Sequence, residues 1–579
     1  MKHFVRVLLA LLTPALVGVS CQRDDIRTAE VAATRIRLDL ASASLHPGET
    51  LRLTVTVEPE NATDKSVSWQ STAPAIANVN QEGLVTAFAE GEATIRVRTT
   101  DGVLAANCRI TVVKETEPTP EPTPTPDPDP SPAPERWTDT GADVPVYPTY
   151  NAVSSLADFP RVDIRTDSGQ PVQSKTSYEG GTISFKDPKQ MYSEVTELKN
   201  LKMQIRGRGN TTWEGYWGSK NPYRIKLDEH TKVFGMKGDK DWILLSDRLD
   251  PSMMRTAVAL RISRLVSMPW TPKFRMAEVY LNGGYAGLYY LVEQKEADRE
   301  NKVPITVAVP GQVEEGGYLL ELDNKSDNDS YFWSSTFGKK VKYKDPDPND
   351  SDAGKRMTAA QKTYITEYFN KVERKLANRE FTGEDSYRAY IEMDSWIQNF
   401  LVHEISMNID GNMRLSTYFA KDGDTKLFMP FVWDFDRAFG NASYQVGDFA
   451  LPQGWPYGWF VRTRGGYPDG ESGGSSYTKG RRPSWYQYLF EDPVFVERLK
   501  ELWALYKPRL DGIPEFMDKM LEYNELAIKH NDTKFYNGYE SEVRQLRSDY
   551  LRRIEWLDTQ IQSLKAQRYN PSTGNFEDL

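Results

Sequence analysis

Apolar and polar residues alternate along residues 35 to 113, so that hydrophobic positions recur at every second residue. The alternating runs are RIRLDL, ETLRLTVTVEP, VSWQS, IANVN, GLVTAF, EATIRVRTT and NCRITVV. Glycine and aspartate separate them at close spacing, as turns between short strands require. The pattern predicts an all-β sandwich. Cys108 alternates with Ala106, Ile110 and Val112 and is expected in its core.

A proline-rich segment, residues 115 to 136, follows this unit and contains ETEPTPEPTPTPDPDPSPAPE. Proline fixes the backbone angle φ and has no N–H group, so the segment can form neither a helix nor an inner strand. In an extended polyproline conformation of ~3.1 Å per residue it would span roughly 50 to 60 Å. A disordered linker has the same composition, and the sequence leaves both interpretations open.

Residues 137 to 579 change from strand patterns to helix patterns. Strands are expected up to about Asp323, in LKMQIRGRG, YRIKLDE, DWILLS and FRMAEVYLNGGYAGLYYLVEQ, the last with a turn at Asn282, Gly283 and Gly284. After Ala353 helices are expected in AAQKTYITEYFNKVERKLA, DSWIQNFLVHEISMNI, DPVFVERLKELWALYKPRL and the stretch from Ser541 to Gln567. This order predicts a two-lobed α+β domain with a cleft between the lobes.

One helix interrupts the strand-rich half, in DPSMMRTAVALRISRL. Asp250 is its expected N-cap and Pro251 its first helical residue. The apolar face consists of Met254, Val258, Ile262 and Leu265.

The stretch FMPFVWDFDRAFG, residues 428 to 440, ends an apolar strand-like run in Asp434 and Asp436. Residues two apart on a strand share a face, so both carboxylates are expected to point at one spot. Desolvated carboxylates are costly without a positive partner. We therefore expect the pair to face the cleft and a hard cation such as Mg²⁺ there. In a purely structural alternative, Asp436 pairs with Arg437 or another basic residue.

Chain length and net charge bear on the number of domains and on the class of ligand. At about one domain per ~150 residues, 579 residues suggest two to four compact units. The net charge of -10 argues against binding to nucleic acid, which requires an excess of Lys and Arg.

The N-terminus has the features of an export signal. Residues 1 to 20 contain two basic residues followed by an apolar run from Val7 to Val19, which is too short to span a bilayer. Gly18, Val19 and Ser20 precede Cys21, a junction that resembles a lipobox. The resemblance implies acyl chains on Cys21, and QRDD behind it resembles the surface-export signal of Bacteroidetes-type lipoproteins. We expect an outer-membrane or cell-surface lipoprotein that contacts the membrane through its lipid anchor only.

Two stretches of the strand-rich half could bind phosphate. In RGRGNTTW, Gly207 and Gly209 would let the backbone approach a ligand, and Arg206 and Arg208 supply donors. In KNPYRIKL, Lys220 begins a strand whose Lys226 could reach a nucleotide's phosphates. Each stretch alone is equally compatible with a tight turn or an ordinary amphipathic strand.

A third stretch, HEISMNIDGNMRLSTYFA, places Asp410 just after an apolar helix, beside Asn408 and Asn412. An aspartate in this position, followed by a strand and then by WDFD, has the order of a catalytic base ahead of a metal-holding aspartate. A turn or cap role for Asp410 is the structural alternative.

These stretches together resemble the CotH kinase family, which consists of atypical secreted kinases. The motifs, in family order over roughly residues 140 to 570, are RGRGNTTW, KNPYRIKL, GMKGDKDWILLSDRLDPSMMR, VYLNGGYAGLYYLVEQ, GGYLLELD, ISMNIDGN and PFVWDFDRAFG. Residues 31 to 114 resemble the bacterial Ig-like group 2 domain, through ENATDKSVSWQS and IANVNQEGLVTAFAEGEATIRV. Such modules act as spacers or adhesive units, so a glycan or protein ligand is expected there.

The CotH resemblance implies a protein-kinase-like fold that transfers phosphate from ATP to Ser or Thr of a protein, with Mg²⁺ or Mn²⁺. It implies that Asp410 accepts the proton of the substrate hydroxyl. It further implies metal binding by Asp434, Asp436 and Asn412, and nucleotide binding by Lys226, Arg206, Arg208, Lys220 and Glu293.

The chain departs from ordinary protein kinases in several places. It has no H-R-D motif, Leu415 stands where a magnesium-binding asparagine is usual, and WDFD replaces D-F-G. The helix from Ser252 to Leu265 has no glutamate to pair with the strand lysine, a role that Glu293 could take.

Other functions fit the sequence less well. GESGG at residues 470 to 474 lacks the strand-turn-helix context of a serine nucleophile, and Met407 breaks the H-E-x-x-H pattern of zinc peptidases. Paired aspartates suit glycoside hydrolysis, but that function leaves RGRGN and Lys226 unexplained. Two alternatives stay open: an inactive surface-anchored binding protein, and transfer of AMP rather than phosphate.

Overall fold

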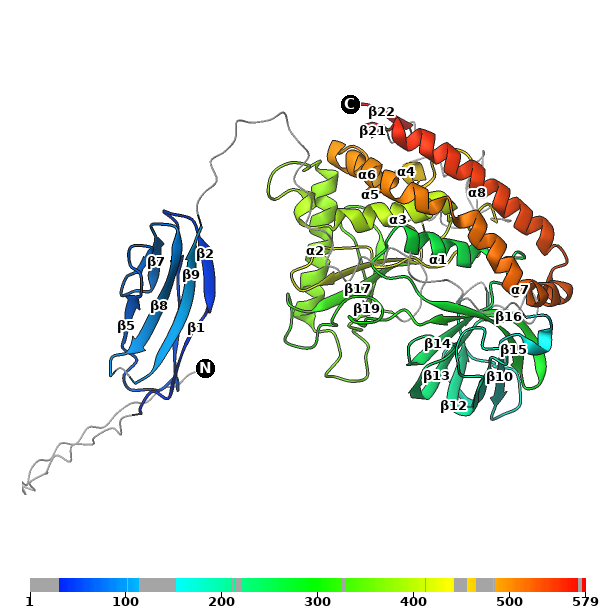
Figure 1. The fold of residues 1–579 in the computed structure, drawn as a ribbon, viewed down its shortest axis with the longest axis horizontal. Helices are drawn as coiled ribbons and strands as arrows, with labels where there is room; N and C mark the ends of the chain where they lie inside the picture. Colours follow the sequence, from blue (N-terminus) through cyan, green and yellow to red (C-terminus); the bar gives the residue numbers. More distant parts are fainter. Residues whose placement is uncertain are drawn as a thin grey trace, which may run out of the picture. The chain divides into compact units, whose positions relative to one another are not determined.

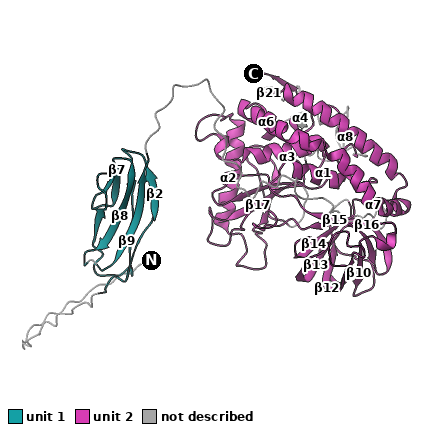
Figure 2. Ribbon diagram, viewed as in Figure 1, with its two compact units in different colours: residues 1–125 teal, residues 126–579 magenta. Residues whose placement is uncertain are grey.

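The computed structural model describes residues 31–101, 103–113, 153–209, 212–213, 220–323, 329–411, 413–441, 456–464, 483, 485–570 and 575–579. The chain divides into two compact units, residues 1–125 and 126–579 (Figure 2). The expected signal peptide, Cys21, the proline-rich segment, Asn412 and GESGG all lie outside the described residues.

The described part of the first unit is all-β, as predicted. Its strands are β1 (Arg35–Leu38), β2 (Ser42–Leu45), β3 (Thr50–Arg52), β4 (Val55–Glu58), β5 (Val67–Ser71), β6 (Ala77–Val79), β7 (Leu84–Ala87), β8 (Gly91–Thr99) and β9 (Ala105–Val112). They form sheets of order β1-β4, β2-β9-β8-β5 and β3-β7-β6. Cys108 is fully buried beside Ile110, which confirms the predicted core position.

A closed barrel begins the second unit (Figure 1). Its order is β10-β11-β12-β13-β14-β16-β15, closed by the parallel pair β10 and β15. The strands are β10 (Arg161–Thr166), β11 (Glu179–Lys186), β12 (Glu197–Gly207), β13 (Tyr223–Thr231), β14 (Asp239–Leu245), β15 (Phe274–Leu281) and β16 (Gly284–Glu293). Asn282 and Gly283 both have positive φ, 50° and 86°, in the two-residue turn of the β15–β16 hairpin.

A second sheet and a set of helices complete this unit. The sheet has the order β18-β19-β17-β20, with β17 (Gly317–Leu322), β18 (Tyr331–Trp333), β19 (Lys340–Asp345) and β20 (Thr417–Asp422). The helices are α1 (Arg255–Leu265), α2 (Ala359–Ala377), α3 (Met393–Ser406), α4 (Val461–Arg464), α5 (Trp485–Leu489), α6 (Pro493–Leu510), α7 (Ile513–Phe535) and α8 (Tyr539–Gln562). Two short strands, β21 (Gln567–Asn570) and β22 (Asn575–Asp578), follow α8.

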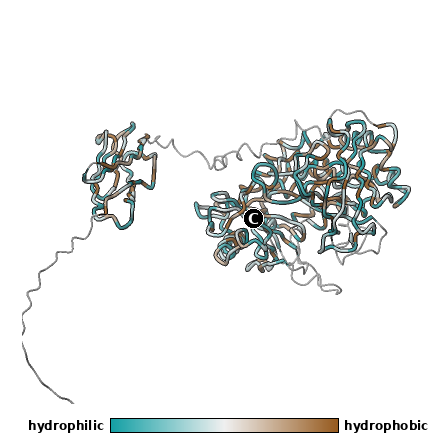
Figure 3. Tube along the Cα trace, turned by 90° about the horizontal axis from the view of Figure 1, so that it is seen from below, coloured by the Kyte–Doolittle hydropathy of each residue, from teal (hydrophilic) through white to brown (hydrophobic). Residues whose placement is uncertain are grey.

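The strand-rich and helix-rich parts of the second unit share one hydrophobic core. Apolar stretches alternate with polar ones along the trace (Figure 3). The core runs from Phe159 near the barrel to Leu564 after α8. Helix α1 lies inside it, in contact with α3, α6 and α7. Among the described helices, none combines the length and the apolar composition needed to cross a membrane.

Helix α1 begins later than predicted, at Arg255 instead of Pro251. Met253 has a φ of 52°, which interrupts the helical conformation just before it. The Asp250 carboxylate still caps this end, because it accepts hydrogen bonds from the backbone N–H groups of Met254 (3.0 Å) and Arg255 (2.8 Å).

Three further expectations differ from the structure. The acidic run is not a strand: residues 429–436 are irregular, and Asp434 has a φ of 74°. The two carboxylates therefore do not share a strand face. The last helix ends at Gln562, and Gln567 belongs to β21. Helix α7 was not predicted, although its apolar face is buried.

Candidate active site

A cleft of about 1220 Å³ lies between the barrel, the second sheet and the segment after α3. The barrel contributes mainly cations and the opposite wall mainly carboxylates. The charged lining residues include Arg206, Arg208, Arg224, Lys226, Lys295, Glu321, Asp323, Lys344, Asp410, Arg414, Asp434, Asp436 and Arg437. Residues far apart in sequence therefore meet in one space.

The barrel wall presents three of the predicted phosphate-binding residues to the cleft. Lys226 is exposed on β13, whose Tyr223, Ile225 and Leu227 are buried as predicted. Arg206 donates to the backbone oxygen of Gly207 (3.2 Å) and lies over the Tyr178 ring. These donors therefore line the cleft side of the barrel.

Arg208 extends from the end of β12 toward Trp433, with 5.7 Å between the guanidinium carbon and the ring centroid. Among the described residues, its guanidinium forms neither a hydrogen bond nor an ion pair. Burial lowers the pKa of Arg208, and the charge of Asp434 opposes that effect. A half-buried guanidinium without a carboxylate partner is suited to an anionic ligand.

The glycines of RGRGN accommodate this chain's own side chains. A Cβ at Gly207 would lie 2.3 Å from the Trp213 ring, and one at Gly209 would lie 2.4 Å from the Thr212 hydroxyl. Gly209 also has a φ of 79°. Local packing thus accounts for both glycines, and the close approach of a ligand to this backbone stays a prediction.

Lys220 does not line the cleft. Its side chain is buried, and its Nζ donates to the sulfur of Met253 at 3.3 Å. The rings of Tyr289, Phe535 and Tyr536 surround it at 5.6 to 5.7 Å. Burial lowers the pKa of Lys220 to about 7, although Asp247 and Asp250 oppose the shift.

Glu293 also lies outside the cleft. Its Oε2 accepts from the backbone N–H of Lys273 at 2.8 Å, and its neighbour across the sheet is Trp242. Burial raises its pKa. The sequence suggested that Glu293 could pair with Lys226. In the structure its carboxylate does not do so.

Lys295, two residues further on, does enter the cleft. Its Nζ lies 4.8 Å from the Trp433 ring centroid and donates to the hydroxyl of Tyr418. That hydroxyl donates in turn to Glu321. Burial lowers the pKa of Lys295 to about 8, while Glu321 raises it and Arg208 lowers it.

The turn after α3 positions Asp410. The backbone N–H of Asp410 donates to Oδ1 of Asn408 at 3.1 Å, and Nη1 of Arg414 lies 3.5 Å from the Asp410 carboxylate. Asn408 is fully buried, whereas the Asp410 carboxylate reaches the cleft. Asn412, the predicted third metal ligand, lies outside the described residues.

Asp434 and Asp436 both reach the cleft despite their irregular backbone. Asp434 is exposed, and its Oδ2 accepts from the hydroxyl of Ser416 at 3.0 Å. Burial raises the pKa of Asp436 well above its ordinary value, and the charges of Asp434, Asp247 and Asp410 add to the shift. Without a cation nearby, the Asp436 carboxyl group therefore keeps its proton more readily than an ordinary aspartate.

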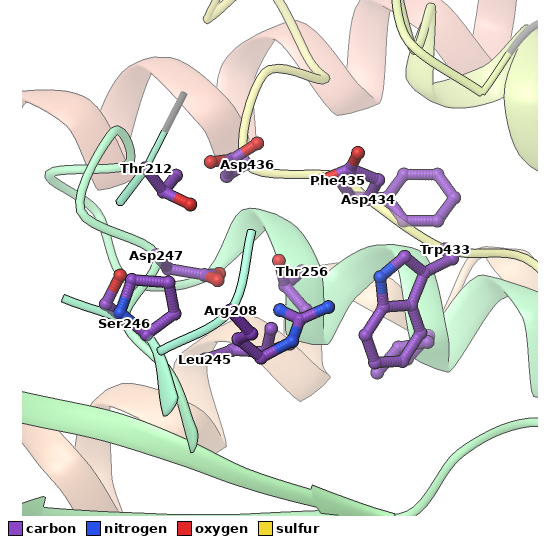
Figure 4. A pocket seen from close by; sticks show the side chains of 12 residues that line it. Arg208, Thr212, Leu245, Ser246, Asp247, Thr256, Trp433, Asp434, Phe435 and Asp436 are labelled. Carbon is purple, nitrogen blue, oxygen red and sulfur yellow. The ribbon is translucent and has the colours of Figure 1, made fainter. Parts of the chain in front are cut away.

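A smaller pocket of about 50 Å³ opens beside these carboxylates (Figure 4). We call it the acidic pocket, because Asp247, Asp434 and Asp436 line it. Oδ2 of Asp247 is buried and has no hydrogen-bond partner among the described residues. Such an orphaned oxygen beside two further carboxylates fits a hard cation, which prefers oxygen ligands. No three His, Cys, Asp or Glu side chains in the described residues approach closely enough to coordinate one directly.

His403 contacts both the turn that contains Asp410 and the segment that contains Asp434 and Asp436. Its ring stacks on Phe435 with centroids 5.3 Å apart, and a Cβ at Gly411 would lie 2.4 Å from it. Burial lowers the pKa of His403 to about 3, so the ring is neutral. It therefore packs between the Asp410 turn and the WDFD segment.

Sequence reasoning missed Asp247, the Lys295 side chain and the positioning role of Asn408. Asp247 carries a signal, since it is a carboxylate directly after the buried strand DWILLS. Lys295 similarly follows an apolar strand. No local pattern predicts the contact of Asn408 with Asp434, because it joins segments 26 residues apart.

Comparison with known proteins identifies both segments. The family profile described as "CotH kinase protein" matches residues 205–557, more than half of the 579-residue chain. The chain belongs to the CotH kinase protein family. The profile "Bacterial Ig-like domain (group 2)" matches residues 32–110. Every charged cleft residue named above lies inside the CotH-matched range.

Curated relatives of this CotH family member match only short stretches. An uncharacterized protein of Clostridium acetobutylicum is 38% identical over 96 residues, 16% of this chain and 24% of that protein. An Ig-like virion protein of Serratia phage KSP90 is 39% identical over 88 residues, 15% of this chain and 34% of that protein. A lacto-N-biosidase of Bifidobacterium bifidum is 32% identical over 167 residues, 27% of this chain and 14% of that enzyme. The chain thus spans between 14% and 34% of the length of these relatives.

Among solved structures, domains 5–6 of the S-layer protein SbsC match with 14% identity and a TM-score of 0.13. The match covers 34% of this chain and 91% of that chain. A TM-score this low carries no conclusion about a shared fold.

Proposed function

We propose that the CotH-matched unit is a two-lobed, kinase-like phosphotransferase that moves the γ-phosphoryl group of ATP to Ser or Thr of a secreted or surface protein. The observation that supports it most is the division of charge across the cleft. Arg206, Arg208 and Lys226 line one wall, while Asp410, Asp434 and Asp436 line the other. Phosphoryl transfer depends on placing such cations and carboxylates around one triphosphate.

Each wall has a distinct part in the reaction. Lys226 and the unpaired guanidinium of Arg208 would bind phosphate oxygens and offset their charge. Asp410 would take the proton of the acceptor hydroxyl as its oxygen bonds to the γ-phosphorus. The bond from that phosphorus to the bridging oxygen breaks, and ADP leaves.

Asp434 and Asp436 would hold Mg²⁺ or Mn²⁺, with Asn412 as a further oxygen donor. The cation supplies charge neutralisation for the phosphates when it is bound. The clustering of Asp434, Asp247 and Asp410 around Asp436 supports this assignment, because a divalent cation offsets the repulsion that opposes ionisation of these carboxyl groups.

The direct test is nucleotide binding by the purified chain. ATP with Mg²⁺ should raise its melting temperature, since a ligand at ~100 times its Kd adds ~2.7 kcal/mol to the folded state. ATP with EDTA should give a much smaller rise. Absence of any shift with ATP and Mg²⁺ would instead favour the inactive binding protein, and the mass of the product separates phosphate transfer from AMP transfer.

We also propose that the protein is exported and held at the cell surface by acyl chains on Cys21, without a spanning helix. The N-terminal sequence and the Ig-like group 2 domain support this location. Cys21→Ala should move the protein from the membrane fraction to the soluble fraction, and retention in the membrane would contradict the anchor.

A further inference from the structure

Asp247 has two unfavourable features at one position. It follows strand β14, is 6% exposed, and has a φ of 41°. One carboxylate oxygen is held by the hydroxyl of Thr256 on α1, while Oδ2 is buried without a hydrogen-bond partner among the described residues. A left-handed backbone and a buried carboxyl oxygen without a hydrogen-bond partner each cost stability, and both concentrate at functional sites.

The orphaned oxygen belongs to the acidic pocket. Figure 4 shows the Asp247 carboxylate extending from one side toward Thr256, with Asp436 and Asp434 on the facing segment. The pocket's volume of about 50 Å³ is enough for a few water-sized groups. The carboxylate therefore faces the proposed cation-binding residues across a small space.

None of the described basic side chains near Asp247 forms a hydrogen bond with its Oδ2. Arg208 lines the same pocket, and its guanidinium forms no ion pair among the described residues. Lys220 acts on Asp247 through its charge but donates to Met253. The nearby Asp250 makes the local charge more negative, although it is paired with Arg255.

The described carboxylates are too far apart for three of them to coordinate one ion directly. Mg²⁺ in proteins keeps several of its waters and takes only one or two carboxylates as ligands. Carboxylates in the next layer accept hydrogen bonds from those waters and raise the affinity for the metal.

We propose that Asp247 is a further part of the cation site, in which its Oδ2 accepts a hydrogen bond from water carried by a divalent cation at Asp434 and Asp436. This assignment rests on the proposed function, because it requires the divalent cation that we propose at Asp434 and Asp436. It adds a positioning residue on the barrel side, joined through Thr256 to helix α1.

The test measures binding of Mn²⁺ to the full chain without nucleotide, by calorimetry and by the electron paramagnetic resonance of free Mn²⁺. Asp247→Asn keeps the shape of the side chain and tolerates the positive φ. Loss of an outer carboxylate typically weakens metal affinity by about 10-fold to 100-fold, so the Kd for Mn²⁺ should rise by that factor.

The melting temperature without metal gives a second test, in which the substitution should not weaken the protein. In EDTA, Asp247→Asn should melt at the same temperature as the wild type or higher, because it removes a carboxyl group whose ionisation is opposed by burial and by the charges of Asp250 and Asp434. If Asp247 only supported the fold, the variant would melt at a lower temperature and bind Mn²⁺ as before.

Glu373→Gln is the matched control. Glu373 in α2 is also buried with one unpartnered carboxylate oxygen, but it lines neither the cleft nor the acidic pocket. This variant should bind Mn²⁺ with wild-type affinity. Equal Mn²⁺ affinity in Asp247→Asn and the wild type overturns the inference alone, whereas failure of the wild type to bind Mn²⁺ overturns it together with the metal part of the proposed function.

Discussion

The side-chain amide of Asn408 joins the two acidic segments of the cleft. Its Nδ2 donates to the backbone oxygen of Asp434 at 2.9 Å, and its Oδ1 accepts from the backbone N–H of Asp410 at 3.1 Å. Asn408 is fully buried, so water cannot replace either bond. One side chain therefore sets the position of the proposed base relative to the proposed metal ligand.

Asn408→Ala should lower phosphate transfer more than its loss of stability explains. Two broken buried hydrogen bonds cost about 1 to 3 kcal/mol of unfolding free energy, and the freed segments move apart. Asn524→Ala is the control, since Asn524 is equally buried in α7 but bonds to Met520 away from the cleft. Rates measured at temperatures where both variants are folded should fall only for Asn408→Ala. An equal fall in both would mean that Asn408 acts through stability alone.

Asp410→Asn should reduce kcat by about 10²-fold to 10⁴-fold, because the amide cannot accept the proton of the acceptor hydroxyl. The affinity for ATP should change by less than about threefold, as the change affects the transition state alone. Steady-state kinetics with varied ATP separates the two effects. A large loss of ATP affinity with unchanged kcat would show that another carboxylate is the base.

Lys295→Met should weaken ATP binding by about tenfold, or about 1.4 kcal/mol, if the ammonium contacts the bound nucleotide in the cleft. Methionine keeps the packing against Trp433 and removes the charge. Lys344→Met is the control, because Lys344 lines the same cleft but is paired with Glu321 and Asp329. Calorimetric titration with ATP and Mg²⁺ should show the larger loss for Lys295→Met; the reverse order contradicts this assignment.

Lys220 should make stability depend on pH. Its pKa is about 7 in the folded chain and near the ordinary 10.5 when unfolded, so the unfolded chain binds more protons between these values. Unfolding free energy should therefore rise as the pH increases from 7 to 10, by on the order of a few kcal/mol. The facing groups are Asp247, Asp250, Tyr289 and Tyr536, and burial raises the pKa of both tyrosines beyond this range.

Lys220→Met should remove that rise while keeping the contacts with the Phe535 and Tyr536 rings. Urea denaturation in EDTA at several pH values measures it. If the wild type and the variant have parallel pH profiles, the lysine is charged in the folded chain and the assignment fails.

Local periodicity predicted the elements that one buried face defines. Helix α2 begins and ends where the apolar repeat places it, and β13 buries Tyr223, Ile225 and Leu227 as the alternation requires. It failed at residues 429–436, where positive φ at Asp434 and the stacking of Phe435 on His403 override strand propensity. Tertiary packing determines the conformation of such segments, and a short stretch of sequence does not reveal that packing.

The sequence predicted the cleft residues that belong to recognisable motifs. Arg206, Arg208, Lys226, Asp410, Asp434 and Asp436 all line one cleft. Lys220 and Glu293 do not, because both side chains are buried away from the cleft, which their sequence neighbours do not reveal. Asp247 joins the cluster through the turn between β14 and α1, a geometry that depends on the folded barrel.

If the cleft assembles one metal-dependent phosphotransfer site, the protein should transfer label from [γ-³²P]ATP to Ser-rich peptides or to itself. Asp434→Asn is the decisive variant, because Asp434 is exposed and its substitution should leave the melting temperature nearly unchanged. We expect Mg²⁺-dependent labelling by the wild type and a loss of about 10²-fold or more in Asp434→Asn. Equal labelling by the folded variant, or none by the wild type with Mg²⁺ or Mn²⁺, would contradict it.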